Sequence, residues 1–228
     1  MERKKLDENI LSNLARIGQV AYSTMDTIHE SYYCTEYVIN KKIEGDIVEC
    51  GVAAGAQIGV IGSSLKNNNI SKKIYCYDSF EGIPMACEKD TAQPGIGYFD
   101  KPLPFVENKE SLLISSGVTV HSLENVKSNL SSWSLNLDDF IFIKGWFQHT
   151  LPSNTIDKIS LLRLDGDLYE STKVCLEYLY PKLSVGGILI IDDWNLDGCV
   201  LACEEYFKKN NIKFAESWQL GNPKYFII

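Results

Sequence analysis

The stretch Gly45-Asp-Ile-Val-Glu-Cys-Gly-Val-Ala-Ala-Gly55 decides how the rest of the sequence is interpreted. Residues 46–50 have the apolar, β-branched character of a buried strand, and the small residues after them predict a tight turn into a helix over about 56–65. Such a glycine turn lets backbone N–H groups approach a ligand beside a helix N-terminus. Because the strand also ends in an acid, Glu49, the turn suits a ligand with ammonium and hydroxyl groups better than a bare phosphate.

A second short apolar run, Lys73-Ile-Tyr-Cys-Tyr-Asp78, also ends in an acid. Asp78 follows Gly51 by 27 residues, which is about the distance at which a doubly wound α/β fold places the acid that accepts the hydroxyls of a ribose. The spacing Glu-x-Gly-x-x-x-Gly, which ends at Gly55, differs from the Gly-x-Gly-x-x-Gly pattern of dinucleotide sites. The stretch therefore indicates either a cofactor pocket or an ordinary strand-to-helix turn.

Composition limits the class of protein. The chain has 228 residues, 45% of them hydrophobic, with a net charge of −8 and a pI near 5.0. This length suits one domain, and nucleic acid is not expected as a partner because phosphate contacts need a basic face. No apolar run approaches the roughly 20 residues that cross a bilayer and no signal peptide is evident, so we expect a soluble, cytoplasmic protein without a membrane partner. The seven cysteines lack a Cys-x-x-Cys pair and predict reduced core thiols.

The remaining patterns predict a Rossmann-like α/β fold with a doubly wound, mostly parallel sheet. Residues 1–44 read as an N-terminal helical cap, and residues 45–228 as the domain that carries the site. Two final strands joined by Gly-Asn-Pro predict an antiparallel C-terminal hairpin. The run 84–104 is rich in Pro and Gly and predicts either a lid or a surface excursion. Further strands are expected at 139–144, 159–165, 188–193, 212–218 and 224–228, and helices at 108–116, 123–133, 173–180 and 196–210.

Acids stand at the ends of the predicted strands, where ligands bind in an open parallel sheet. After Glu49 and Asp78 come Asp165 and the pair Asp192-Asp193. If the strands of Asp165 and Asp192 are adjacent, their ends lie about 4.8 Å apart, and a carboxylate there must keep a proton unless a cation lies between them. Oxygen ligands without Cys or His favour Mg²⁺, with Mn²⁺ or Ca²⁺ as alternatives. The structural alternative is that Asp193 caps the next turn and only Asp192 faces the site.

Two nearby patterns have structural interpretations. Arg163 lies two residues before Asp165 on the same strand face, so it is expected to be a buried partner of one of these acids or of Glu49. Asp167 and Glu170 have capping-box spacing, which predicts a helix start rather than chemistry.

Two side chains after the strand 139–144 could contribute to a site. Trp146 could stack on a purine or simply fill the core. His149 lies in the same turn and is the histidine to weigh as a general base.

Five segments, in order along the chain, resemble the successive motifs of one known family. They are Gly45-Asp-Ile-Val-Glu-Cys-Gly-Val52, Tyr77-Asp-Ser-Phe-Glu-Gly-Ile-Pro84, Ile143-Lys-Gly-Trp-Phe-Gln-His-Thr-Leu-Pro152, Leu162-Arg-Leu-Asp-Gly-Asp-Leu-Tyr-Glu-Ser-Thr172 and Gly186-Gly-Ile-Leu-Ile-Ile-Asp-Asp193. They look like the motifs of the macrocin O-methyltransferases, which are metal-dependent class I S-adenosylmethionine (SAM) methyltransferases of sugar hydroxyls in macrolides and related natural products. The resemblance covers about residues 36–210.

This resemblance implies a class I methyltransferase fold and transfer of a methyl group from SAM to a hydroxyl of a sugar or glycosylated natural product. It implies that Glu49 and Gly51 line the methionine end of SAM, that Asp78 holds the ribose and that Trp146 lies near the adenine. Ser79 lies in the second motif and Gly55 ends the glycine turn after the first, and both are also expected to bind the cofactor.

The resemblance also implies a metal site. Asp165, Asp192 and Asp193 would hold Mg²⁺, with Mn²⁺ as the alternative ion, and Asp165 would be the general base, with His149 as the alternative base. The sequence departs from the family pattern in three places. Two alanines follow the first glycine where a bulkier pair is usual, His149 replaces the usual Asp, and the region before the first strand is short. That region helps to enclose the acceptor.

Other interpretations of the sequence remain at this point. A catechol-type acceptor would chelate Mg²⁺ in the same way as a sugar, an NAD-dependent oxidoreductase could use Asp78 equally well, and a non-catalytic SAM-binding homologue could keep the fold. We expect a small-molecule sugar acceptor, and a homo-oligomer is compatible with the sequence.

Overall fold

The computed structural model describes residues 3–90 and 112–228. These residues form one mixed sheet of seven strands in the order β3-β2-β1-β4-β5-β7-β6. The first five strands in that order are parallel, and β7 and β6 are antiparallel to their neighbours. The strands are β1 (Asp46–Cys50), β2 (Ile74–Asp78), β3 (Phe140–Lys144), β4 (Ile159–Leu164), β5 (Leu183–Ile191), β6 (Glu216–Gln219) and β7 (Lys224–Ile227).

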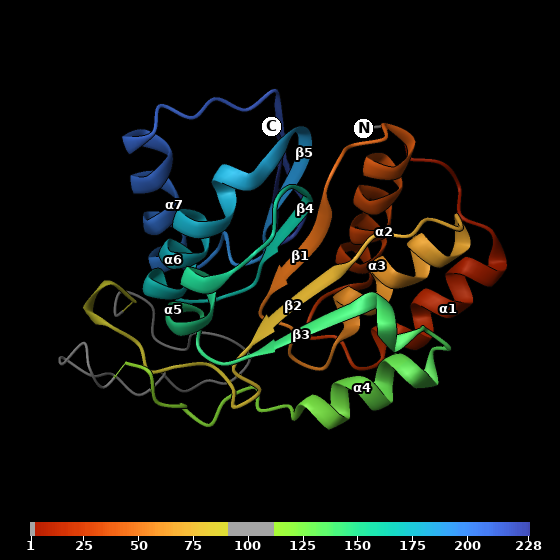
Figure 1. The fold of residues 1–228 in the computed structure, drawn as a ribbon, viewed down its shortest axis with the longest axis horizontal. Coiled ribbons are helices and arrows are strands. Elements are labelled where there is room, and N and C mark those ends of the chain that lie inside the picture. The colour runs from red at the N-terminus through yellow and green to blue at the C-terminus, as the bar shows by residue number, and fades with distance from the viewer. Residues whose placement is uncertain (1–2, 91–111) are drawn as a thin grey trace.

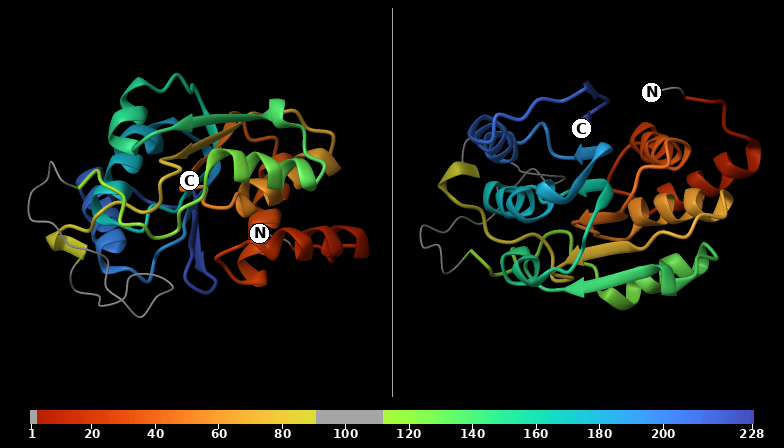
Figure 2. Two further views of the ribbon diagram at one scale, coloured as in Figure 1. Left: turned by 90° about the horizontal axis from the view of Figure 1, so that it is seen from below. Right: turned by 45° about the horizontal axis from the view of Figure 1, so that its top comes forward.

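Helices cover both faces of the sheet (Figures 1 and 2). One layer holds α1 (Glu8–Gly18), α2 (Met25–Asn40), α3 (Ala56–Asn67) and α4 (Leu123–Ser132), and the other holds α5 (Phe147–Thr150), α6 (Tyr169–Leu179) and α7 (Asp197–Lys209). Because side chains alternate along a strand, neighbours such as Ile47 and Val48 enter different cores, and Leu161 and Leu162 do the same. The strands are therefore apolar on both faces, as parallel strands between two helical layers must be.

The segment before β1 contributes to one of these cores. Leu14 and Ile17 of α1 and Ile28 and Val38 of α2 are fully buried in the cluster that also contains Ile47. The helices expected before the first strand are thus present, and they pack with α3 on the sheet. The boundary at residue 44 stays a prediction.

Most expected elements form where the sequence patterns placed them, including the C-terminal hairpin of β6 and β7. β5, however, begins at Leu183 rather than at residue 188, because the segment with Gly186 and Gly187 forms an irregularity within the strand instead of a loop before it. A side chain at Gly187 would lie 2.9 Å from the backbone oxygen of Ser160. Gly187 is therefore needed for close approach of the backbone, whereas Gly186 is needed for its φ of +79°.

The expected helix over 108–116 is not formed where it can be assessed. Its residues 108–111 lie outside the described part of the chain, and residues 112–116 contain no helix. Ser115 instead forms an antiparallel bridge with Pro84. Residues 91–104 of the expected lid also lie outside the described residues.

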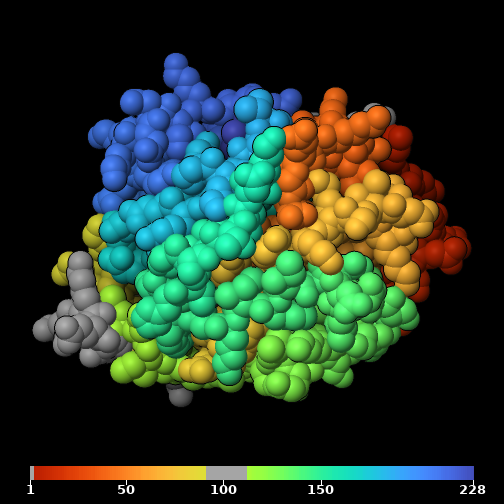
Figure 3. Space-filling view, viewed as in Figure 1, coloured from red at the N-terminus to blue at the C-terminus, as the bar shows by residue number. Residues whose placement is uncertain are grey.

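Three further features concern the surface, the cysteines and the lengths of the helices. In the space-filling view, α4 and the edge strand β3 (both green) lie together along the lower side (Figure 3). All seven cysteines are free. None of the helices in residues 3–90 and 112–228 has the length and apolar character needed to cross a bilayer.

Candidate active site

An open pocket lies at the carboxyl ends of the central parallel strands. Gly51, Asp78, Ser79, Trp146 and Asp165, all expected from the sequence, are among its lining residues. A smaller pocket adjoins it and shares Tyr22, Ala53 and Asp165 with it, and its lining also includes Glu49, Arg163 and Asp192. Five strand ends and turns thus converge on two connected pockets, with Asp165 bordering both.

Gly51 allows the turn after β1 to lie against the end of β4. Its φ is +90°, and a Cβ there would lie 1.7 Å from the backbone oxygen of Asp165. No other residue fits this contact. Gly55, with φ +88°, precedes α3 as its N-cap residue and does not line either pocket.

Asp78 joins the turn after β1 to the turn after β2. Its Oδ2 accepts hydrogen bonds from the backbone N–H groups of Val52 (2.7 Å) and Ala53 (3.1 Å), and its Oδ1 accepts one from Phe80 (2.6 Å). A carboxylate has about four lone-pair positions, so about one remains, on Oδ1. Burial raises the pKa of the Asp78 carboxyl, and these backbone bonds oppose the shift. Asp78 can therefore accept a hydrogen bond from one hydroxyl of a ribose but not from both.

The opposite wall of the larger pocket comes from the turn after β3. Trp146 is half-buried and lines the pocket beside Phe147 and Gln148, so its ring is not enclosed in either core. This position favours the stacking interpretation, which stays a prediction. His149 is exposed and is not among the residues that line the pocket.

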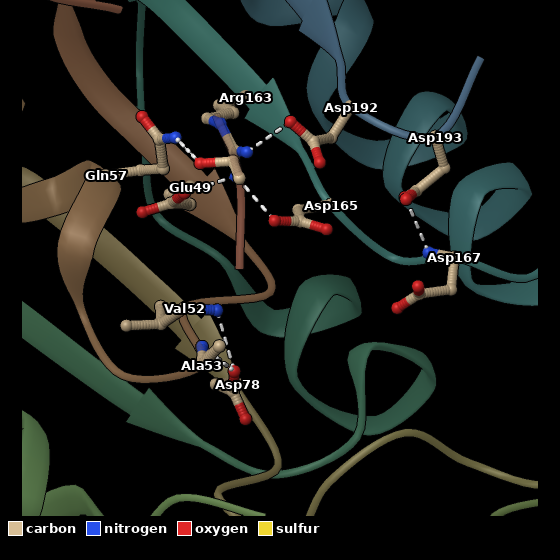
Figure 4. A network of polar contacts seen from close by, with 11 residues as sticks. Glu49, Val52, Ala53, Gln57, Asp78, Arg163, Asp165, Asp167, Asp192 and Asp193 are labelled. Atoms are coloured by element: carbon tan, nitrogen blue, oxygen red, sulfur yellow. Dashed lines mark hydrogen bonds and ion pairs between the residues drawn. The ribbon is translucent and has the colours of Figure 1, made fainter. Parts of the chain in front are cut away.

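Arg163 is the centre of the polar network between the two pockets (Figure 4). Its Nη1 donates to Glu49 Oε1 (2.6 Å) and to Asp165 Oδ2 (2.7 Å), and its Nη2 donates to Asp192 Oδ1. The side chains of Arg163 and Glu49 are both 1% exposed. The prediction that Arg163 is a buried partner of these acids is confirmed, and it binds three of them at once.

Two buried acceptors at the smaller pocket have no donor. Glu49 Oε2 and Gln57 Oε1 lack a hydrogen-bond partner within the described residues, although Gln57 Nε2 donates to Ser23 Oγ (3.0 Å). Burial raises the pKa of the Glu49 carboxyl to about 8, and Arg163 acts against that rise. Buried acceptors without partners are costly, so this pocket suits a ligand that brings an ammonium group.

A cluster of acids lies on the other side of Asp165. Asp165, Asp167 and Asp193 can each offer an oxygen atom such that all three atoms lie within 4.8 Å of one another. The two strands that precede these acids are adjacent, since β4 pairs in parallel with β5. Asp167 has φ +56°, and its backbone N–H donates to Asp193 Oδ2 (2.9 Å).

The residues in this cluster differ from the predicted set by one. Asp192 turns toward Arg163, whereas Asp193 turns toward Asp167 (Figure 4). The capping-box interpretation of Asp167 is wrong, because the N-cap position of α6 is Leu168 and no side chain within that turn caps the helix. The second acid of Asp165-Gly166-Asp167 was the feature of the sequence that could have identified Asp167 as a candidate metal ligand.

Like charges crowd this cluster. Burial, and then Asp165 and Asp192, raise the pKa of the Asp167 carboxyl, and burial followed by Asp167 raises that of Asp193. Over residues 3–90 and 112–228, neither Asp167 nor Asp193 forms an ion pair. Three acid oxygens at this separation match the hard oxygen ligands of Mg²⁺ or Mn²⁺.

Residues 15–217 match the model of the macrocin O-methyltransferase (TylF) family. The chain belongs to this family. The match covers both pockets and the acidic cluster, and it agrees with the resemblance that the five sequence motifs indicated.

Individual relatives agree with this assignment. The chain is similar to the 8-demethyl-8-(2,3-dimethoxy-alpha-L-rhamnosyl)-tetracenomycin-C 4'-O-methyltransferase of Streptomyces olivaceus, with 35% identity over 76% of this chain and 62% of the relative. It is also similar to the demethyldecarbamoylnovobiocin O-methyltransferase of Streptomyces niveus, with 36% identity over 78% of this chain and 64% of the relative. The chain thus spans less than two thirds of the length of either relative.

The fold has a solved counterpart. The O-methyltransferase NovP superimposes with a TM-score of 0.73 and 33% identity, over 90% of this chain and 81% of NovP. The predicted class I methyltransferase fold, a mostly parallel sheet with an antiparallel C-terminal hairpin, is confirmed.

Proposed function

We propose that this protein is a SAM-dependent, divalent-cation-dependent O-methyltransferase that acts on a sugar hydroxyl of a glycosylated small molecule. The observation that carries the proposal is the position of Asp165. Asp165 borders the pocket suited to the methyl donor and also belongs to the acidic cluster. Its hydrogen bond to Arg163 fixes it in this position. Family membership supplies the reaction class, and the rhamnosyl substrate in the name of the Streptomyces olivaceus relative supports the acceptor class.

The donor would occupy the two connected pockets. Glu49 Oε2 and Gln57 Oε1 would accept from the ammonium of the methionine end, which gives both orphaned acceptors a partner. Asp78 Oδ1 would accept from one ribose hydroxyl, and Trp146 would stack on the adenine. Gly51 and Ser79 line the wall between these groups.

The cation would be held by Asp165, Asp167 and Asp193, with Asp192 kept on Arg163. A cation there neutralises carboxylates that otherwise repel one another. When bound, SAM supplies an electrophilic methyl group, and the cation lowers the pKa of an acceptor hydroxyl that it coordinates.

Asp165 is proposed as the general base. Arg163 holds its Oδ2, and the other oxygen points toward the side of Asp167 and Asp193 (Figure 4). The carboxylate is 28% exposed, so it can reach an acceptor in the pocket. Proton transfer to a positioned carboxylate contributes roughly 10²–10⁴-fold to a rate, and alignment of donor and acceptor contributes up to about 7–11 kcal/mol. His149, exposed and outside the pocket lining, is not proposed as the base.

The test is an acceptor panel. The protein is incubated with SAM and Mg²⁺ and with glycosylated and catechol acceptors, and products are analysed by mass spectrometry for the gain of one methyl group. EDTA should abolish the product, and Asp165→Asn should abolish it while leaving SAM affinity within about tenfold, since its role lies in proton transfer and metal binding. Methylation at the normal rate in EDTA would refute the metal, and NAD binding without SAM binding would refute the reaction class.

A further inference from the structure

The helix α6 begins immediately after the acidic cluster but has no cap of its own. Its N-cap residue Leu168 is extended and offers no side-chain acceptor. The turn before it is tight, because the Leu168 N–H donates to the Gly166 oxygen at 2.5 Å and Asp167 adopts φ +56°. The first backbone N–H groups of a helix need acceptors, and Asp167 lies two residues before Tyr169, the first residue of this helix.

Asp90 supplies the missing cap from a distant part of the chain. Its Oδ1 accepts a hydrogen bond from the Tyr169 N–H at 2.8 Å, across 79 residues of sequence. Its Oδ2 accepts one from the Cys87 N–H at 3.0 Å, so the same carboxylate also orders its own turn. The side chain is 4% exposed, and a negative charge at a helix N-terminus is favourable.

The surroundings of Asp90 leave room for this carboxylate. Gly198 lies in the first turn of α7, and a Cβ at this position would come within 2.0 Å of Asp90 Oδ1. The neighbouring Lys89 places Nζ 3.7 Å from the centre of the Tyr169 ring, and the Tyr169 hydroxyl donates to Glu205 at 2.5 Å. The segment that ends at Asp90 (yellow in Figure 1) is therefore fixed to both α6 and α7.

We propose that Asp90 is a positioning residue for the acidic cluster, which acts by fixing the start of α6 and hence the orientation of Asp167. This inference rests on the proposed function, since it assigns a task to the cluster that the function requires. Asp90 does not belong to the cluster itself and does not line the donor pockets. Asp167 and Ser171 also line the larger pocket, but Asp167 is proposed as a ligand of the cation only, so loss of the Asp90 carboxylate should lower cation affinity much more than SAM affinity.

The experiment measures Mn²⁺ affinity, by electron paramagnetic resonance, and SAM affinity, by calorimetry, on the full chain, three variants and one control variant. Asp90→Ala removes both hydrogen bonds, and we expect Mn²⁺ affinity to fall at least about tenfold while SAM affinity stays within about twofold; changes around metal ligands typically cost 10–100-fold. Asp90→Asn keeps an oxygen for the Tyr169 N–H, so its Mn²⁺ affinity should stay within about threefold. Gly198→Ala displaces the carboxylate without removing it and should resemble Asp90→Ala.

Asp7→Ala is the matched control. Asp7 is also a carboxylate that caps a helix, accepting from the Ile10 N–H at 2.9 Å, but at the exposed start of α1. It should lower thermal stability without changing Mn²⁺ affinity. If Asp90→Ala does not fold, Gly198→Ala and Asp90→Asn decide the matter. A folded Gly198→Ala or Asp90→Ala protein that binds Mn²⁺ as the parent does would overturn this inference alone, whereas a parent that binds no Mn²⁺ would overturn the proposed metal centre and this inference with it.

Discussion

The carboxylates on the two sides of Asp165 differ in whether the protein supplies them with a positive partner. On one side, Glu49 and Asp192 are buried against Arg163, which the protein itself supplies as the counter-charge. On the other side, Asp167 and Asp193 face each other, and the described residues supply no cationic side chain to either. The protein itself therefore neutralises the Arg163 side, whereas the acidic cluster has no cationic side chain among the described residues, which is why we propose that it takes an ion from solution.

The largest expected effect comes from removing the counter-charge on the Arg163 side. Arg163→Met should lower the free energy of unfolding by about 3–5 kcal/mol, because it leaves buried carboxylates without a partner. Urea denaturation measures this change. The contrasting variant is Asp193→Asn, which removes repulsion in the acidic cluster and should leave stability in metal-free buffer equal or higher. If both variants destabilise equally, the two sides do not differ as described.

The next effect separates Asp167 from Asp192 as the third metal ligand. Asp167→Asn should weaken Mg²⁺ binding by about 10–100-fold, whereas Asp192→Asn should act mainly on stability through its bond to Arg163. Calorimetric titration with Mg²⁺ gives the first quantity and thermal unfolding the second. The reverse ranking in Mg²⁺ affinity would restore Asp192 to the ligand set that the family resemblance implies.

The third effect concerns the pH dependence of SAM binding. The pKa of Glu49 is raised to about 8 by burial, so below that pH Glu49 carries a proton that an incoming ammonium must displace. SAM affinity should therefore rise with pH, by up to about tenfold per unit, until Glu49 ionises near this pKa. Glu49→Gln should bind SAM more weakly and without this rise. Calorimetry over about pH 6–8 tests it, and a wild-type affinity that is flat over this interval would remove Glu49 from the ammonium site.

The smallest effect is expected at the edge of the pockets. Tyr22 lines both of them, and its hydroxyl lies 2.8 Å from His121 Nε2 in an exposed position. Exposed neutral hydrogen bonds contribute about 0.5–1.5 kcal/mol at most, so Tyr22→Phe should change SAM affinity by less than about tenfold. A larger loss would mean that the Tyr22 hydroxyl contacts the donor directly.

What the sequence predicted well depends on periodic patterns and on strand ends. Apolar strands followed by acids predict that Glu49, Asp78 and Asp165 lie at one edge of the sheet, because parallel strands all end there, and each of these acids lines one of the two pockets. Arg163 could be predicted as a partner because residues two apart share a strand face. These inferences need only local spacing and the fold class.

What the sequence did not predict depends on contacts between distant segments. Asp167 resembled a helix cap because capping patterns are read over a few residues, whereas the true cap of α6 is Asp90, 79 residues away in the sequence. The sequence predicts a shorter strand than β5 because the adjacent glycines Gly186 and Gly187 indicate a loop. In each case the sequence shows the residue type, but it does not show the distant segment that this residue contacts, and that contact decides its role.

Because one guanidinium nitrogen of Arg163 serves two acids, binding at one acid is expected to affect binding at the other. Arg163 Nη1 donates to Glu49 and to Asp165 alike, so an ammonium arriving at Glu49 and an ion arriving at Asp165 both change the demand on the same donor. Thermodynamic linkage then requires that each ligand alter the affinity of the other by one common factor. We therefore expect the affinity for the donor to depend on whether the ion is bound, and the affinity for the ion to depend on the donor in the same way.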